Sequence, residues 1–155
     1  MTLFSRCGRV IAAAALAGLL SCAGGPKPTM VQAALDVQPT VNPDSRGRPS
    51  PIVIRLYALK SLGAFNSAAF FSLFEKDKDT LGSELVDSEE FQLMPGEKRE
   101  IKKEFKPEAR YVAVFAAFRD TERAQWRAAL AIPAQKTFVV QVRLENNKVS
   151  LTTGR

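Results

Sequence analysis

The stretch IVIRLYALK, residues 52–60, decides the fold class of this chain. Ile52, Val53 and Ile54 are β-branched and Tyr57 is aromatic, which favours a strand over a helix. Apolar residues occupy almost every position, whereas a strand with one solvated face alternates apolar and polar side chains. We therefore expect a strand that is buried on both faces, or one with a helix packed over its outer side.

Further segments on both sides of this stretch have the composition or the period-two alternation of short strands. They are residues 31–37, 90–94, 101–105, 111–118 (YVAVFAAF), 125–130, 137–144 (TFVVQVRL) and 149–153. Residues 111–118 are the most apolar and are predicted as a central strand. About eight short strands separated by turn signals are typical of a sandwich. We predict a mainly β domain over residues 30–155, an antiparallel sandwich of two sheets.

Two short turns support this arrangement. Pro95-Gly96 suits the centre of a type II turn, because proline presets φ and glycine accepts a positive φ. Asn146-Asn147 predicts a tight hairpin, since asparagine tolerates positive φ.

A helical insertion is predicted after the second strand, at about residues 64–83. Asn66 or Ser67 is able to cap its start by accepting a hydrogen bond from an unpaired backbone N–H. Gly82 is suited to end it, because glycine is common where helices terminate.

Phenylalanine is concentrated in this insertion, at positions 65, 70, 71 and 74. Phe70, Phe71 and Phe74 fall at helical spacing. Phe65 lies just before the predicted cap, where it can pack back onto the helix. Our preferred interpretation is that these rings fill the core of the domain. The alternative is an exposed apolar patch that binds a partner.

The loop between the first two predicted strands is long and stiffened by proline. Residues 42–51 (NPDSRGRPSP) hold three prolines and one glycine. Loops on a rigid scaffold often carry recognition, and Arg46 and Arg48 supply charge-assisted donors. From the residues alone, a binding loop and a solvated crossover both stay open.

Residues 1–21 are predicted as an export signal that is removed. Arg6 and Arg9 precede an apolar run at residues 10–20 (VIAAAALAGLL). The run is shorter than the roughly 20 residues that span a bilayer, but it suits a signal peptide. Ser21 supplies a small residue before Cys22.

The sequence Leu19-Leu20-Ser21-Cys22 resembles the bacterial lipobox. That resemblance implies cleavage before Cys22, a diacylglycerol on its sulfur and a third acyl chain on the new amino terminus. Ala23, in place of aspartate, implies transport to the outer membrane. Residues 22–29 then form a lipidated, flexible tether. An ordinary signal peptide with a chance cysteine is the alternative.

The sequence lacks residue types that the common catalytic sites require. The chain has no histidine, which removes the usual general base and any Ser-His-Asp or Cys-His site. Asp77 and Asp79 open like a calcium loop, but Leu81 and Ser88 replace required oxygen ligands. The net charge of +6 is spread along the chain rather than clustered. We expect no enzyme, no metal, no nucleic acid, no small-molecule substrate and no cofactor except lipid on Cys22.

Several motifs occur in an order that resembles the TssJ family (also SciN or VasD), outer-membrane lipoproteins of the type VI secretion system. After the lipobox these are Asn-Pro-Asp-x-x-Gly-Arg-Pro-x-Pro at 42–51, Leu59-Lys60 before Phe65 and Ala69-Phe70, Leu93-Met94-Pro95-Gly96-Glu97, Phe118-Arg119-Asp120 and Trp126-Arg127. The resemblance covers nearly all of the chain after the signal.

This resemblance implies a transthyretin-like sandwich that is lipid-anchored at the periplasmic face of the outer membrane. It implies an adaptor that anchors the secretion membrane complex by binding the periplasmic domain of the inner-membrane protein TssM. The implied contact residues are Asn42, Pro43, Asp44, Ser45, Arg46, Gly47, Arg48, Pro49 and Ser50, of which we favour Asp44, Arg46 and Arg48.

A different class of function stays open beside the adaptor. A periplasmic lipoprotein could instead bind a small ligand or a cell-wall glycan in an aromatic pocket. The candidate lining residues are Phe65, Phe70, Phe71, Phe74 and Trp126.

Overall fold

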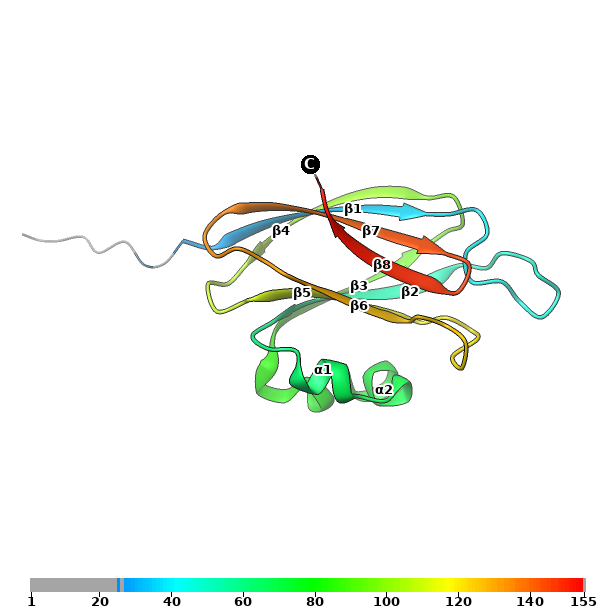
Figure 1. Ribbon diagram of the computed structural model, residues 1–155, viewed down its shortest axis with the longest axis horizontal. Helices are drawn as coiled ribbons and strands as arrows, with labels where there is room; N and C mark the ends of the chain where they lie inside the picture. Colours follow the sequence, from blue (N-terminus) through cyan, green and yellow to red (C-terminus); the bar gives the residue numbers. More distant parts are fainter. Residues whose placement is uncertain (1–24, 26, 155) are drawn as a thin grey trace, which may run out of the picture.

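The computed structural model describes residue 25 and residues 27–154, which form two four-stranded sheets packed face to face (Figure 1). Sheet A has the order β4-β1-β7-β8, with β1 Thr29–Val37, β4 Lys98–Phe105, β7 Thr137–Glu145 and β8 Lys148–Thr153. Sheet B has the order β3-β2-β5-β6, with β2 Ile52–Leu59, β3 Leu85–Leu93, β5 Tyr111–Ala116 and β6 Arg127–Ala131. The predicted mainly β sandwich is confirmed.

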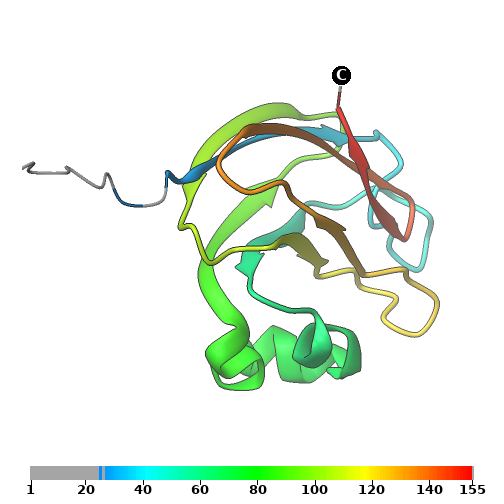
Figure 2. The ribbon, with the colours of Figure 1, turned by 60° about the vertical axis from the view of Figure 1, so that its left-hand side comes forward.

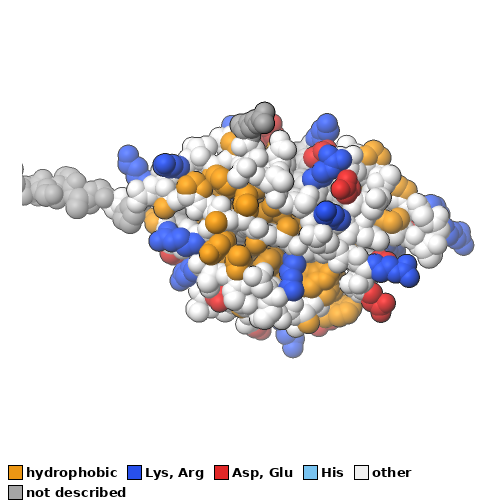
Figure 3. Space-filling view, in the orientation of Figure 1, with side chains coloured by type: hydrophobic (Ala, Val, Ile, Leu, Met, Phe, Trp, Pro, Cys, Tyr) orange, Lys and Arg blue, Asp and Glu red, His pale blue; other side chains and the backbone are white. Residues whose placement is uncertain are grey.

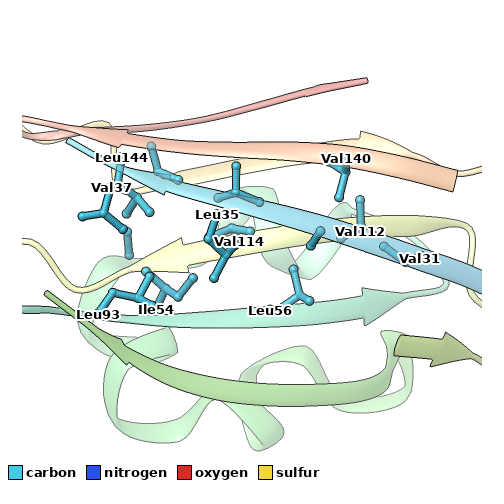
Figure 4. Packing of buried hydrophobic residues seen from close by; sticks show 14 of the residues in the cluster. Val31, Leu35, Val37, Ile54, Leu56, Leu93, Val112, Val114, Val140 and Leu144 are labelled. Atoms are coloured by element: carbon cyan, nitrogen blue, oxygen red, sulfur yellow. The ribbon is translucent and has the colours of Figure 1, made fainter. Parts of the chain in front are cut away.

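The main core lies between the two sheets. Along β1 every second side chain is buried, as the alternation in its sequence predicts. Val31 and Leu35 of this strand face Ile54 and Leu56 of β2 across the space between the sheets (Figure 4).

No helix among the described residues is long and apolar enough to cross a membrane.

One strand pair departs from the antiparallel expectation. β1 and β7 run parallel, with Val31 opposite Phe138 and Leu35 opposite Val142, whereas every other strand pair is antiparallel. Alternation in the sequence fixes which side chains face the core but not the direction of a neighbour. The orientation of β7 is set by the intervening chain, most of which builds sheet B.

The outer face of sheet B is covered by helices (Figures 1 and 2). These are α1 Gly63–Ser67, α2 Phe70–Leu81 and the 3₁₀ helix η1 Gly82–Glu84. Tyr57 and Leu59 of β2 point away from the main core, yet both are fully buried in a second cluster beneath the helices. The prediction of a helix over the outer side of residues 52–60 is therefore confirmed.

The start of the predicted helix was wrong. Neither Asn66 nor Ser67 caps α2; its N-cap is Ala69, with no side-chain hydrogen bond. Ser67 ends α1 instead, and its hydroxyl bonds back to the carbonyl of Gly63 at 2.9 Å. Gly82 does end α2, at φ 50°.

The two predicted turns are present. Gly96 takes φ 80°, and the N–H of Glu97 donates to the carbonyl of Met94 at 3.0 Å. Asn146, at φ 43°, turns β7 into β8. The Pro95-Gly96 turn joins β3 to β4 and so carries the chain from sheet B to sheet A.

Other boundaries differ from the predicted ones. β3 begins at Leu85 rather than Glu90, because its first half, in which Asp87, Ser88 and Glu89 are polar, also pairs with β2 along the edge of sheet B. β6 begins at Arg127, and Gln125 before it forms only an isolated bridge to Lys148. β1 includes Thr29, which the sequence placed in the tether.

Arg55 fastens α2 to sheet B at a kink in the helix. Lys76 has non-helical angles (φ −140°, ψ 45°), which interrupt the helical hydrogen bonds of the preceding turn. One guanidinium nitrogen of Arg55 donates to the carbonyls of Leu73 and Phe74, at 2.7 and 3.0 Å. Its Nε donates to Glu90 on β3 at 2.7 Å.

Two further side chains of sheet B hold the insertion. Arg127 donates to the carbonyls of Phe65 and Ala68, at 2.8 and 2.9 Å, and stacks over Trp126 at 4.5 Å. The hydroxyl of Tyr57 donates to Asp77 at 3.1 Å. Burial, followed by the nearby charge of Asp77, raises the pKa of Tyr57, so this hydroxyl stays protonated.

Some phenylalanines of the insertion fill the core, as we preferred, and others are exposed, as in the alternative interpretation. Phe65 is buried, whereas Phe71 and Phe74 are 59% and 43% exposed. Phe70 connects the two groups, since it contacts Phe71, Phe115 and Trp126 at ring distances of 5.1–5.4 Å. The expectation that all four rings fill the core is thus wrong for Phe71 and Phe74.

Replacement of Arg55 by methionine is expected to lower the free energy of unfolding by about 1–3 kcal/mol, because the carbonyls at the α2 kink lose their donor. Urea denaturation measures the change. Arg143→Met is the matched control, since Arg143 pairs only with the exposed sheet-A carboxylates Asp36 and Glu145 and should cost little. Equal losses in the two variants would contradict the assigned role of Arg55.

Candidate functional site

Four connections meet at one end of the sandwich, which we call the loop end. They are residues 38–51, 94–97, 117–126 and 146–147, joining β1 to β2, β3 to β4, β5 to β6 and β7 to β8. β1 begins at the opposite end, which we call the anchor end, because the chain before Thr29 leaves the domain there (Figure 1). The length of the strands therefore separates the N-terminal segment from the loop of residues 42–51.

Asn42 holds the base of this loop from inside. It is 3% exposed and adopts a left-handed φ of 51°. Its side-chain nitrogen donates to the carbonyl of Pro51 at 2.8 Å, and its side-chain oxygen accepts the N–H of Arg119 at 2.9 Å. Its own N–H donates to Asn146 at 2.7 Å. One buried residue thus ties three connections of the loop end together, two through its side-chain amide and the third through its backbone N–H.

Asp44 orders the tip of the loop. One carboxylate oxygen accepts the N–H groups of Arg46 and Arg48, at 2.8 and 2.9 Å. The other accepts Nε of Arg48 at 2.8 Å. The N–H of Gly47, at φ 77°, donates to the carbonyl of Asp44. The backbone N–H of Arg48, and then its guanidinium, hold the pKa of Asp44 below its usual value, so the carboxylate keeps these bonds at neutral pH.

The predicted contact residues occupy three different environments. Ser45, Arg46, Gly47, Arg48 and Pro49 are exposed, Pro43, Asp44 and Ser50 are half-buried, and Asn42 is buried. Arg48 is bound by Asp44, whereas Arg46 has no side-chain partner among the described residues. The exposed tip, residues 45–49, is therefore the part of the loop that can touch another molecule.

The structure adds residues that the sequence did not assign to the site. Arg119 donates to the hydroxyl of Ser50 at 3.0 Å and braces the loop from the side. A depression of about 590 Å³ lies beside it, lined by Pro43, Asp44, Ser45, Arg119, Asp120, Arg123 and Asn147. Phe118-Arg119-Asp120 is one of the motifs that carried the family resemblance, but no periodicity places it next to residues 42–51.

No candidate metal centre is present in the described part of the chain. Residues 25 and 27–154 contain no group of three side chains of the ligand types histidine, cysteine, aspartate or glutamate arranged to hold a metal. Asp77 is the first residue of the segment that resembles a calcium loop in the sequence. Its carboxylate accepts a hydrogen bond from the hydroxyl of Tyr57 and lies near the guanidinium of Arg55. Cys22, the predicted lipidation site, lies outside the described residues, as does the signal at residues 1–21.

Substitution of Asn42 by glycine is expected to lower the free energy of unfolding by about 1–3 kcal/mol. Glycine accepts the positive φ, so the loss reports the two side-chain hydrogen bonds. Thermal or urea unfolding measures it. Asn146→Gly is the control, because Asn146 also has a positive φ but is exposed. A neutral Asn42→Gly would show that the base of the loop does not depend on this amide.

Comparison with known proteins identifies the family of the chain. Residues 29–147 match the family described as type VI secretion lipoprotein, VasD, EvfM, TssJ, VC_A0113 (T6SS-SciN). No match was found among curated proteins.

Solved structures of the same fold support this match. The T6SS lipoprotein TssJ1 from Pseudomonas aeruginosa is 36% identical with a TM-score of 0.79, over 83% of this chain and 98% of that one. Serratia marcescens Lip, described as a membrane-bound component of the type VI secretion system, is 25% identical with a TM-score of 0.69, over 81% and 97%. A chain of a structure described as the type VI membrane complex shares the fold at 21% identity and a TM-score of 0.66, over 81% and 98%. The sandwich, its helical insertion and the match over residues 29–147 together place this chain in the TssJ family of type VI secretion lipoproteins.

Proposed function

We propose that this chain anchors the membrane complex of a type VI secretion system to the outer membrane. In this proposal the lipid on Cys22 holds the anchor end at the periplasmic face of that membrane. The loop end binds the periplasmic domain of the inner-membrane protein TssM. The chain then acts as an adaptor rather than as an enzyme.

The observation that carries the proposal is the separation of the two ends. The N-terminal segment leaves from the start of β1, and residues 42–51 project from the other end of the same strands (Figure 1). A protein that links a membrane to a partner needs its two attachment points apart and a stiff body between them. Two packed sheets supply such a body.

The build of the loop also suits recognition. Its base is fixed by the buried side chain of Asn42 and its tip by Asp44, while Arg46 and Pro49 stay exposed. A loop that is ordered before it meets its partner loses less conformational entropy on binding. Arg46 is a free charged donor at this tip, able to pair with a carboxylate of the partner.

The described structure does not favour the alternative of an aromatic ligand pocket. Phe70, Phe74 and Trp126 pack on one another and on Phe115 instead of lining a cavity. The cavities of about 590 and 530 Å³ are lined by other residues. These aromatics instead join the helical insertion to sheet B.

Replacement of residues 45–49 by a Gly/Ser linker of equal length is expected to abolish binding to the periplasmic domain of TssM. The thermal midpoint should stay nearly unchanged, because Asn42 and Asp44 remain in place. A pull-down or calorimetric titration measures binding. A Gly-Ser-Gly replacement of residues 106–108 at the anchor end is the matched control and should bind as the parent does. Unimpaired binding by the tip variant would refute the assigned contact.

Removal of the lipidation site separates anchoring from binding. Residues 23–155 exported behind an ordinary cleavable signal peptide should be released into the soluble periplasmic fraction by a high-salt wash, since no acyl chain holds them to a bilayer. The domain should still bind TssM in a pull-down, yet secretion should be lost. Retention in the outer-membrane fraction after the high-salt wash, or normal secretion, would contradict a role for Cys22 in anchoring.

A further inference from the structure

The anchor end presents a ring of basic side chains around the point where the N-terminal segment joins the domain. Its members are Lys27, Lys60, Lys106, Arg110 and Lys136, and all five are exposed. Figure 3 shows several Lys and Arg side chains at the left-hand end, where β1 begins in Figure 1. We call these five residues the basic collar. They come from four segments, with Lys106 and Arg110 both in the β4–β5 connection, so no single run in the sequence reveals them.

Backbone hydrogen bonds fix the collar around the start of β1. The N–H of Met30 donates to the carbonyl of Lys136 at 3.2 Å, and the buried hydroxyl of Thr29 donates to the carbonyl of Pro133 at the same distance. The N–H of Arg110 donates to the carbonyl of Leu59 at 2.8 Å. The N-terminal segment is thus pinned to the loop that carries Lys136.

The collar cations are free to meet an outside anion. Among residues 25 and 27–154, none of the five forms an ion pair. At the loop end Arg48, Arg99 and Arg143 are paired, while other exposed cations there, such as Arg46, form no ion pair among the described residues. Among the described residues, the guanidinium of Arg110 donates only to the carbonyl of Pro107, at 3.0 Å. The carboxylates nearby are Glu84, which already accepts the N–H of Ala64 at 2.9 Å, and the exposed Glu104 and Glu108. Positive charge therefore remains in excess at this end.

The tether brings this end to a bilayer. Residues 22–29 span at most about 25 Å even when fully extended, so a lipid on Cys22 would keep the domain within that distance of the bilayer. Exposed charges act over about 8 Å at physiological ionic strength, a distance inside this limit. A polybasic surface beside a lipid anchor adds to the attraction for anionic lipids.

We propose that the basic collar is a docking surface for the anionic headgroups of the membrane that holds the lipid anchor. When the collar contacts the headgroups, the anchor end of the sandwich faces the bilayer. The loop of residues 42–51 then points away from it. The inference rests on the proposed anchoring at Cys22, but the headgroup contact can be tested without the acyl chains.

Vesicle binding by residues 23–155 tests the collar directly. All described helices and strands lie between Thr29 and Thr153, so this chain keeps the whole domain. It should co-sediment with vesicles of phosphatidylcholine and phosphatidylglycerol in equal parts, but not with phosphatidylcholine alone, and high salt should release it. The variant Lys60→Gln, Lys106→Gln, Lys136→Gln should bind at least about tenfold more weakly.

A charge-matched variant at the loop end controls for net charge. Arg46→Gln, Arg123→Gln, Lys148→Gln removes the same number of exposed cations and should bind vesicles as the parent does. Equal weakening of both variants, or binding that ignores phosphatidylglycerol, would overturn the proposal. Thermal midpoints confirm that both variants fold. The collar variant should still bind TssM in solution, so failure of the collar and failure of the adaptor function give different results.

Orientation supplies a second readout. Residues 23–155 contain no cysteine, so a single introduced cysteine carries a unique environment-sensitive label. A label on Ser61→Cys at the anchor end should shift to the spectrum of a membrane environment on anionic vesicles. A label on Ser45→Cys at the loop tip should not shift. The reverse pattern would place the wrong end of the sandwich on the bilayer.

Discussion

Burial of β2 and β5 on both faces is the constraint on which the rest of the domain depends. Their inner side chains pack against sheet A, and their outer side chains, among them Tyr57 and Phe115, are covered by the helical insertion. Two arginines on the outer side of sheet B, Arg55 and Arg127, are stable there because helix carbonyls accept their donors. The insertion is therefore a third layer of the domain.

This layered body gives the molecule two distinct ends. All strands run between the anchor end and the loop end, so each connection lies at one or the other. The parallel pairing of β1 with β7 places the start of both strands at the anchor end, beside Lys136. The chain belongs to a family of secretion lipoproteins, and this geometry suits the adaptor role proposed above.

The loop end shows how a rigid base and an exposed tip are combined. Asn42 is buried, and its side-chain oxygen and nitrogen are both hydrogen-bonded, so its role is to fix residues 38–51 against Arg119 and Asn146. The carboxylate of Asp44 then accepts the backbone N–H groups of Arg46 and Arg48 and the guanidinium of Arg48. The residues left for a partner are fewer than the motif suggests, because part of the motif serves the loop itself.

The sequence by itself determined the strands, the turns at Pro95-Gly96 and Asn146-Asn147, the helical insertion and the family, since period, glycine and asparagine act locally. It also predicted the two-sided burial of residues 52–60. Only the tertiary structure decided the direction of β7, the start of α2, the exposure of Phe71 and the grouping of the basic collar. Each of these depends on contacts between residues far apart in the chain, where local propensity carries no information.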